Sequence, residues 1–344
     1  MEQKKIGRRR FLGLLAGGVV TGFGLASTLQ GSAAFVVSPG APEETGAPDL
    51  LLDVVLLGDP RYNDDFFDRG NDRARRAILS QFQRESARAV IFVGDLVLKG
   101  TDTRDWGTFN RLVAPLRSRG QQIIPVLGNH ELEGGPTEVA LRNYFANFPE
   151  LKGQRWYSQR MASCLFIICD SQSPMQSGSP QGDWIRHKLE TVPEDVDFVL
   201  IIMHHPVYTR STKSLFHRGH PALAEHTAFG KELEQLQREL HATIMVISGH
   251  VHNYERYIVN GPTYIVSGGG GGTPHSISRR STDFYQDPGD TFHFLRLRMG
   301  PNCRLQVSMV KLMSLDNPRW EIRDSFELTP TSSKVSCVAQ EQKR

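Results

Sequence analysis

The sequence predicts an α/β fold with mixed sheets, and three observations lead to it. In the first half of the chain, short runs of Val, Ile and Leu alternate with longer segments of helical character. These runs are continuous rather than alternating, as in strands covered on both faces. Hydrophobic residues make up 39% of the 344 residues and charged residues 22%, which is enough apolar surface for a large core and excludes a mainly disordered or fibrous chain.

The expected elements follow the chain in two groups. Six strands of the first kind are predicted at residues 51–58, 89–94, 121–128, 164–170, 197–204 and 243–249. Helices between the first three strands make a β-α-β-α-β series, and another helix is expected over 221–241. After Glu255 the helical pattern ends and the apolar residues alternate, which is typical of antiparallel strands. These are predicted at 256–260, 262–268, 291–299 and 303–312.

Residues 1–34 are predicted to be a twin-arginine export signal. Arg8-Arg9-Arg10-Phe11-Leu12 fits that pattern, and no charged residue follows until after Pro42. Small residues at Ser32 and Ala34 favour cleavage after Ala34, with an uncleaved membrane anchor as the alternative. The twin-arginine export machinery is therefore an expected partner, and a periplasmic or extracellular location is expected.

Three further segments complete the predicted organisation. Residues 35–49 are expected to form a linker, because 38–49 are rich in Pro, Gly and acidic residues. Residues 50–328 are expected to form the folded domain, and 329–344 a polar tail. The four cysteines are too scattered for a disulfide framework, so buried thiols are expected, and one long-range bridge stays open.

The formal net charge of +3 does not indicate a nucleic-acid-binding protein. Five of the 40 basic residues and one of the 37 acidic residues lie in residues 1–34, which leaves 35 basic and 36 acidic residues in the rest of the chain. That part has no basic run or stripe to bind a phosphate backbone. No obligate nucleic-acid partner is predicted.

Residues that bind metals well follow five of the predicted strands. They are Asp59, Asp95, the pair Asn129 and His130, the pair His204 and His205, and His250 with His252. A single Gly-Asp pair after a strand is commonly only a turn. Because open α/β sheets bind ligands at the carboxyl ends of their strands, the five together predict one shared site. Carboxylate, amide and imidazole ligands suit Mn, Fe or Zn.

This ordered set of motifs resembles the calcineurin-like metallophosphoesterases over residues 50–272, and GHVHNYER at 249–256 is similar to the purple acid phosphatase branch. The resemblance implies a four-layer α/β/β/α sandwich that holds two metal ions, Fe, Mn or Zn, at a sheet edge. It implies that Asp59 and His252 bind the first metal and that Asp95 bridges both. It also implies that Asn129, His204 and His250 complete the second metal.

Two positions depart from the family. A His usually stands two residues after the first Asp, where this chain has Arg61, and purple acid phosphatases have a tyrosinate where it has Leu98. Arginine cannot bind a metal because it stays protonated. Tyr62 is a candidate substitute ligand, and no charge-transfer colour is expected. Arg61 is predicted to hold a substrate phosphate oxygen, with a surface ion pair as the alternative.

The predicted activity is hydrolysis of phosphate esters, with monoesters favoured, by a metal-bound hydroxide that attacks phosphorus in line. The resemblance places His130 to donate to the phosphate or leaving group, and His217 and His220 resemble the substrate loop of purple acid phosphatases. The alternative for each is an exposed loop histidine. His205 is expected to pack or to support a ligand.

The expected substrate is a phosphorylated small molecule or surface component. Two other functions stay open: a phosphodiesterase on the same scaffold, and an exported phosphate-binding protein with a decayed metal site. The glycine run 268–272 lacks the Lys-Ser/Thr and the helix of a phosphate-binding loop. It is expected instead to bring the backbone close to the metal site.

Overall fold

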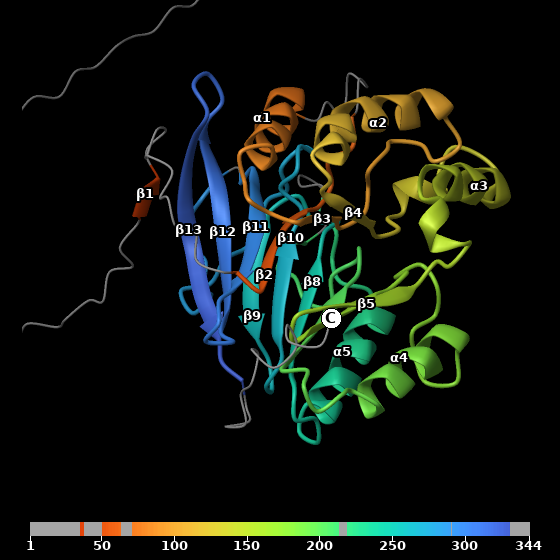
Figure 1. Ribbon diagram of the computed structural model, residues 1–344, viewed down its shortest axis with the longest axis vertical. Helices are drawn as coiled ribbons and strands as arrows, with labels where there is room; N and C mark the ends of the chain where they lie inside the picture. Colours follow the sequence, from red (N-terminus) through yellow and green to blue (C-terminus); the bar gives the residue numbers. More distant parts are fainter. Residues whose placement is uncertain (1–34, 38–49, 63–70, 213–218, 290, 331–344) are drawn as a thin grey trace, which may run out of the picture. The chain divides into compact units, whose positions relative to one another are not determined.

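The computed structural model describes residues 35–37, 50–62, 71–212, 219–289 and 291–330, all of which belong to one unit that spans 34–344 (Figure 1). The predicted export signal, His217 and most of the predicted tail lie outside the described residues. No helix within the described ranges has the length and hydrophobicity needed to cross a lipid bilayer.

The first sheet contains the parallel series that the sequence predicts. Its seven strands follow in the order β1 (Phe35–Val37), β13 (Arg319–Leu328), β12 (Leu305–Ser314), β11 (His293–Met299), β2 (Leu52–Leu57), β3 (Ala89–Phe92) and β4 (Gln122–Pro125). β2, β3 and β4 are parallel, and α1 (Asp72–Phe82) and α2 (Thr103–Ser118) connect them. β1 lies in the segment assigned above to a linker, yet it pairs antiparallel with β13, a strand that the sequence analysis did not predict.

The second sheet has six strands. Their order is β5 (Tyr157–Met161), β6 (Cys164–Ile168), β7 (Phe198–Ile202), β8 (Thr243–Ser248), β10 (Thr263–Ser267) and β9 (Tyr254–Ile258). The four inner strands are parallel, and the two edge strands are antiparallel to their neighbours. β10 therefore matches the predicted antiparallel pairing only towards β9, because the chain returns from the sheet edge and inserts β10 beside β8.

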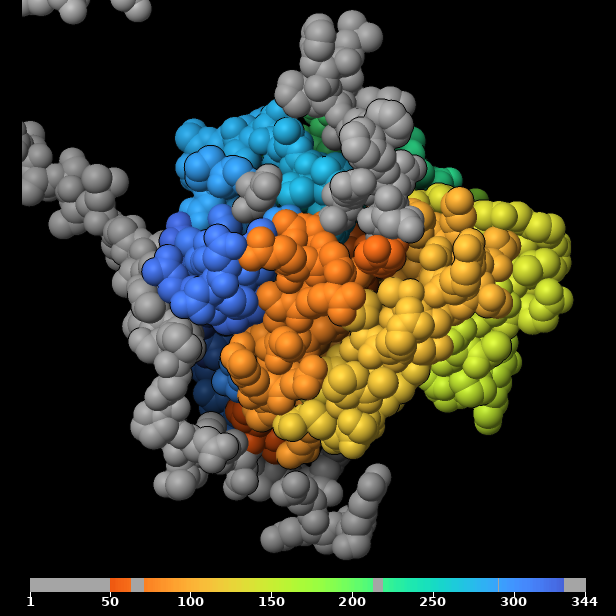
Figure 2. Space-filling model, turned by 90° about the horizontal axis from the view of Figure 1, so that it is seen from above, coloured from red at the N-terminus to blue at the C-terminus, as the bar shows by residue number. Residues whose placement is uncertain are grey.

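The two sheets pack face to face, and helices cover their outer faces. Val54 and Leu56 of β2 point into the core between the sheets, together with Phe166 of β6. Val55 and Leu57 point the other way, against α1, α2 and α3 (Thr137–Asn147). Figure 2 shows α1 and α2 side by side over this face, in orange and yellow. The continuous apolar runs thus reflect strands that are buried on both faces.

The outer face of the second sheet packs against α4 (Pro180–Glu190) and α5 (Ala224–Leu236), which completes the predicted α/β/β/α order of layers. α5 is shorter than the helix predicted over 221–241. Two 3₁₀ turns, at His130–Leu132 and Pro149–Leu151, lie on either side of α3. Cys164 and Cys169 are buried free thiols, as expected.

Candidate metal centre

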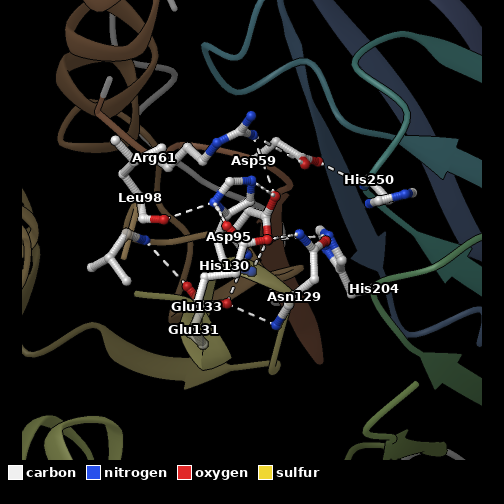
Figure 3. A network of polar contacts seen from close by, with 12 residues as sticks. Asp59, Arg61, Asp95, Leu98, Asn129, His130, Glu131, Glu133, His204 and His250 are labelled. Carbon is white, nitrogen blue, oxygen red and sulfur yellow. Dashed lines mark hydrogen bonds and ion pairs between the residues drawn. The ribbon is translucent and has the colours of Figure 1, made fainter. Parts of the chain in front are cut away.

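The residues predicted from the five strand ends lie together beyond the carboxyl ends of β2, β3, β4, β7 and β8 (Figure 3). His204 Nε2 is 3.2 Å from Asp95 Oδ1, and His252 Nε2 is 3.3 Å from Asp59 Oδ1. Segments up to 193 residues apart in the chain therefore share one site. This convergence follows from the sheet topology, because parallel strands end at the same edge.

The backbone that presents these side chains is unusual. Asp59, Asp95 and His250 have positive φ angles of 59°, 54° and 65°. Residues other than glycine rarely adopt this conformation, which clusters at functional sites. Gly94 makes room beside them, since a Cβ atom there would lie 2.4 Å from His204 Nδ1. The loops are thus shaped to bring the side chains close together.

Three of these residues form a group with the chemistry of a metal site. Asp59, Asp95 and His204 are buried, and each offers a ligand atom within 4.8 Å of the others. His204 Nδ1 donates to Val93 O at 2.8 Å, which turns Nε2 towards the carboxylates. Burial lowers the pKa of His204, but the charges of Asp95 and Asp59 outweigh burial and raise it to about 9. A bound metal ion would replace the proton at His204 Nε2.

Buried polar atoms without a hydrogen-bond partner mark where a cation fits. They are Asp59 Oδ1, Asn129 Oδ1 and His204 Nε2. The Asn129 amide nitrogen donates to Glu133 Oε1 at 2.9 Å, so its oxygen is turned to the site. Buried polar atoms without partners are rare, and oxygen and imidazole acceptors together suit a metal ion. These residues fit the group that the family resemblance implies.

His250 stands beside this group. Its backbone N–H donates to Asp59 Oδ2 at 2.9 Å, and its ring centroid is 5.1 Å from that of His204. Burial and the charge of His204 hold the pKa of His250 well below its usual range, so the imidazole is neutral. We call Asp95, Asn129, His204 and His250 the His204 half of the site.

The other half is occupied by Arg61. Its Nη1 lies 3.0 Å from His252 Nε2, 3.3 Å from Asp95 Oδ2 and 4.0 Å from Asp59 Oδ1. The side chain is only 7% exposed, which excludes the alternative of a surface ion pair. We call Asp59, Arg61 and His252 the Arg61 half. Tyr62, the candidate substitute ligand, packs its ring under the Arg75 guanidinium instead, 4.8 Å away.

A cavity of about 600 Å³ opens above both halves. It is lined by Arg61, Asp95, Asn129, His130, His205, Pro206, Gly219, His220, Pro221, Leu223, His226, His250, His252 and His275. His130 Nδ1 contacts Leu98 O at 2.7 Å. His220 stacks on His275 at 4.6 Å, so this loop histidine belongs to the cavity wall. His205 bonds to Ser171 Oγ at 2.8 Å and also faces the cavity.

Three residues that shape the site were not predicted from the sequence. Glu131 is buried and accepts hydrogen bonds from the backbone N–H groups of Asp95 at 2.9 Å, Leu96 at 2.7 Å and Gly128 at 2.7 Å. It ties the loop after β3 to the loop after β4 (Figure 3). Glu133 orients Asn129. Both acids lie within three residues after the GNH motif, which was the only available signal.

His275 is the third such residue. Its ring stacks on His252 at 4.2 Å, and its Nδ1 accepts from the His252 backbone N–H at 3.1 Å. It follows no strand, so no pattern indicated it. The glycine run passes close by, as expected, since a Cβ atom at Gly272 would lie 2.5 Å from the His252 ring and one at Gly268 would lie 2.8 Å from Asp59 Oδ2.

The sequence model of the family described as calcineurin-like phosphoesterase matches residues 52–254, which contain all five strand ends. The chain belongs to this family. Membership of the calcineurin-like phosphoesterases explains why the motifs occur in this order and why the chain has this fold.

Individual relatives point to one branch. The chain is 30% identical over 242 residues to a phosphoenolpyruvate phosphatase of Allium cepa, covering 65% of this chain and 47% of the relative. It is 29% identical over 210 residues to purple acid phosphatase 21 of Arabidopsis thaliana, covering 56% and 46%. The chain thus spans about half the length of the curated relatives it matches.

A solved structure agrees in fold. The purple acid phosphatase PPD1 from yellow lupin seeds matches with a TM-score of 0.63 at 19% identity, over 82% of this chain and 54% of that one. At this identity the likeness concerns the fold. It supports the arrangement of two mixed sheets described above.

Proposed function

We propose that this calcineurin-like phosphoesterase is an exported, metal-dependent enzyme that hydrolyses phosphate monoesters. The observation that carries the proposal is the set of buried polar atoms without a hydrogen-bond partner, Asp59 Oδ1, Asn129 Oδ1 and His204 Nε2, beside an open cavity whose wall includes Asn129. A cavity that exposes metal ligands and is lined by histidines is suited to a phosphate ester.

The His204 half would hold the metal ion, through Asp95, Asn129, His204 and His250. When bound, a divalent ion supplies a Lewis acid for phosphate oxygens and activates water for attack on phosphorus. The chain's own residues provide the rest. His130 Nδ1 donates to Leu98 O, and the ring lines the cavity, so that the imidazolium form, protonated at both nitrogens, can donate the Nε2 proton to the leaving oxygen. Arg61 brings a positive charge to the cavity wall, where it can offset phosphate charge.

The preference for monoesters is supported by the names of the two curated relatives, both phosphatases, one of them acting on the monoester phosphoenolpyruvate. The expected substrate is a phosphorylated small molecule or surface component. A phosphodiesterase on the same fold is the alternative within the same chemistry.

A second candidate function is an exported protein that binds phosphate without turnover. One observation favours it: Arg61 Nη1 sits between Asp95 and His252, where the resemblance implies a metal ion. The complete ligand set of the His204 half argues against it.

An activity panel decides among these functions. The protein is assayed on p-nitrophenyl phosphate and on bis(p-nitrophenyl) phosphate with Mn, Fe or Zn. Faster hydrolysis of the monoester is expected, and faster hydrolysis of the diester would favour the diesterase. Asn129→Ala should abolish turnover, whereas Asn317→Ala, at an exposed turn, should not. If the folded protein binds phosphate but hydrolyses neither compound with any of these metals, the proposed enzymatic function is wrong.

Export through the twin-arginine machinery to the periplasm or beyond is proposed from Arg8 and Arg9, with membrane attachment only if the signal stays uncleaved. Changing both residues to Lys keeps the charge but removes the guanidinium pair that the receptor reads. Cell fractionation should then find the variant in the cytoplasm. The same distribution as the native protein would rule out this route.

A further inference from the structure

Arg61 occupies the position that the family resemblance assigns to the first metal ion. The resemblance gives that ion three ligands: Asp59, Asp95 and His252. Arg61 Nη1 lies 3.0 Å from His252 Nε2, 3.3 Å from Asp95 Oδ2 and 4.0 Å from Asp59 Oδ1. One guanidinium nitrogen therefore faces the same three side chains that would otherwise bind a cation.

Arg61 Nη1 lies within hydrogen-bond distance of two acceptors, His252 Nε2 and Asp95 Oδ2, whereas Asp59 Oδ1 at 4.0 Å is only an ion-pair neighbour. His252 Nδ1 contacts Thr273 O at 2.7 Å and is the protonated nitrogen, so Nε2 presents a lone pair to Arg61. Asp95 accepts through Oδ2. A metal ion and a guanidinium cannot share these acceptors, because both are cations and both need the same lone pairs.

The two halves also differ in what remains for a metal. In the His204 half, Asn129 Oδ1 is buried without a hydrogen-bond partner, and His204 Nε2 faces only the carboxylate of Asp95, 3.2 Å away. In the Arg61 half, His252 Nε2 and Asp95 Oδ2 already contact a donor. Tyr62, the nearest candidate for a further ligand, is turned to Arg75. The residues thus fit one ion and do not fit a second.

We propose that the Arg61 guanidinium replaces one metal ion of the pair, so that this protein has a mononuclear centre with a built-in second cation. Arg61 is anchored on Asp95 and lines the cavity, so its charge faces the position of a phosphate. A fixed guanidinium offers charge and directed hydrogen-bond donors to a phosphate, but it cannot coordinate a water molecule and activate it for attack as a metal ion does. The phosphate would therefore meet one metal ion and one arginine.

The first experiment counts metal ions. The inference rests on the proposed metal-dependent function, but the count is made without turnover. The full chain is saturated with Mn²⁺, freed of excess metal by gel filtration and analysed for Mn per chain. About one ion per chain is expected, and Arg61→His should raise the count to about two, as in dinuclear sites. Two ions in the native chain, or none, would overturn the proposal.

Electron paramagnetic resonance gives a second readout. The native protein should show the signal of isolated Mn²⁺, and Arg61→His that of a spin-coupled pair. Arg160→His is the matched control, because this arginine lies on β5 and pairs with Asp195 on the surface. It should leave both readouts unchanged.

Two further variants keep the test decisive if Arg61→His does not fold. His252→Ala should retain the ion, because His252 contacts Arg61 rather than the metal, whereas His204→Ala should lose it. Loss of the ion from His252→Ala would contradict the assignment. If the native protein binds one ion per chain but hydrolyses no phosphate ester, the proposed enzyme function is wrong, whereas the inference of a mononuclear centre still holds.

Discussion

Each half of the site contains an aspartate and a histidine, but the two halves differ in what these side chains contact. In the His204 half, Glu133 holds Asn129 so that its Oδ1 stays unpaired, and Val93 O holds His204 so that its Nε2 faces Asp95. In the Arg61 half, an arginine already satisfies His252 and Asp95. Under the proposal above, a motif fixes where a side chain stands, whereas its neighbours decide whether its polar atoms remain open to a metal.

The largest effect is expected from removing a ligand of the His204 half. His204→Ala takes away the buried Nε2 and should lower turnover by at least about 100-fold, since even supporting residues of metal sites contribute about 10- to 100-fold. Metal analysis should show that the ion is lost. His187→Ala, at an exposed position on α4, is the control. Near-native activity of His204→Ala would show that this half is not the metal site.

The second prediction concerns Glu131, whose carboxylate holds together the two loops that carry Asp95 and Asn129. Glu131→Ala would leave the buried N–H groups of Asp95, Leu96 and Gly128 without an acceptor. The free energy of unfolding should fall by at least about 3 kcal/mol, because each unsatisfied buried group costs about 1 to 3 kcal/mol. Chemical denaturation measures it, with Glu138→Ala on the exposed surface of α3 as control. An equal, small effect of both variants would contradict this role.

A smaller effect is expected from removing the guanidinium of Arg61 in the Arg61 half. With one equivalent of metal ion, Arg61→Ala should mainly raise KM. The resulting fall in kcat/KM should correspond to a loss of about 1.5 to 3 kcal/mol of transition-state binding, the value of a charged hydrogen bond. Steady-state kinetics measures this, and Arg61→Lys, which keeps the charge but not the fork of donors, should fall in between. Unchanged kinetics in Arg61→Ala would mean that the guanidinium does not meet the substrate.

The smallest effect is expected at Glu133, which orients Asn129 through Oε1 and lies 3.2 Å from His130 Nδ1 through Oε2. Glu133→Ala should weaken metal affinity by about 10-fold, at the lower end of the range for supporting residues, because the side chain is half exposed. Glu133→Gln keeps an oxygen acceptor and should restore most of the affinity. Isothermal titration with Mn²⁺ distinguishes the two. If Gln behaves like Ala, the contact to Asn129 does not carry the effect.

Sequence could predict the residues of the site that follow strands. Asp59, Asp95, Asn129, His204 and His250 each stand where a buried apolar run ends, and the parallel topology brings such ends together. The layers could be predicted for the same reason, since runs buried on both faces need two neighbours. His275 could not, because it reaches the site from an irregular loop.

The position of Arg61 shows a different limit. Its departure from the family pattern was visible, and a role as phosphate clamp was predicted. That its Nη1 would lie between His252 and Asp95 depends on a contact across 191 residues, which no local pattern encodes. Likewise β13 was missed, because its charged residues hide the apolar alternation.

The most direct test of the difference between the two halves is the position of bound metal in a crystal of the native protein soaked with Mn²⁺. Anomalous scattering locates each ion without reference to activity. One peak is predicted, among Asp95, Asn129, His204 and His250, with the Arg61 guanidinium in contact with Asp95 and His252. A second peak among Asp59, Asp95 and His252, with Arg61 displaced, would contradict the account.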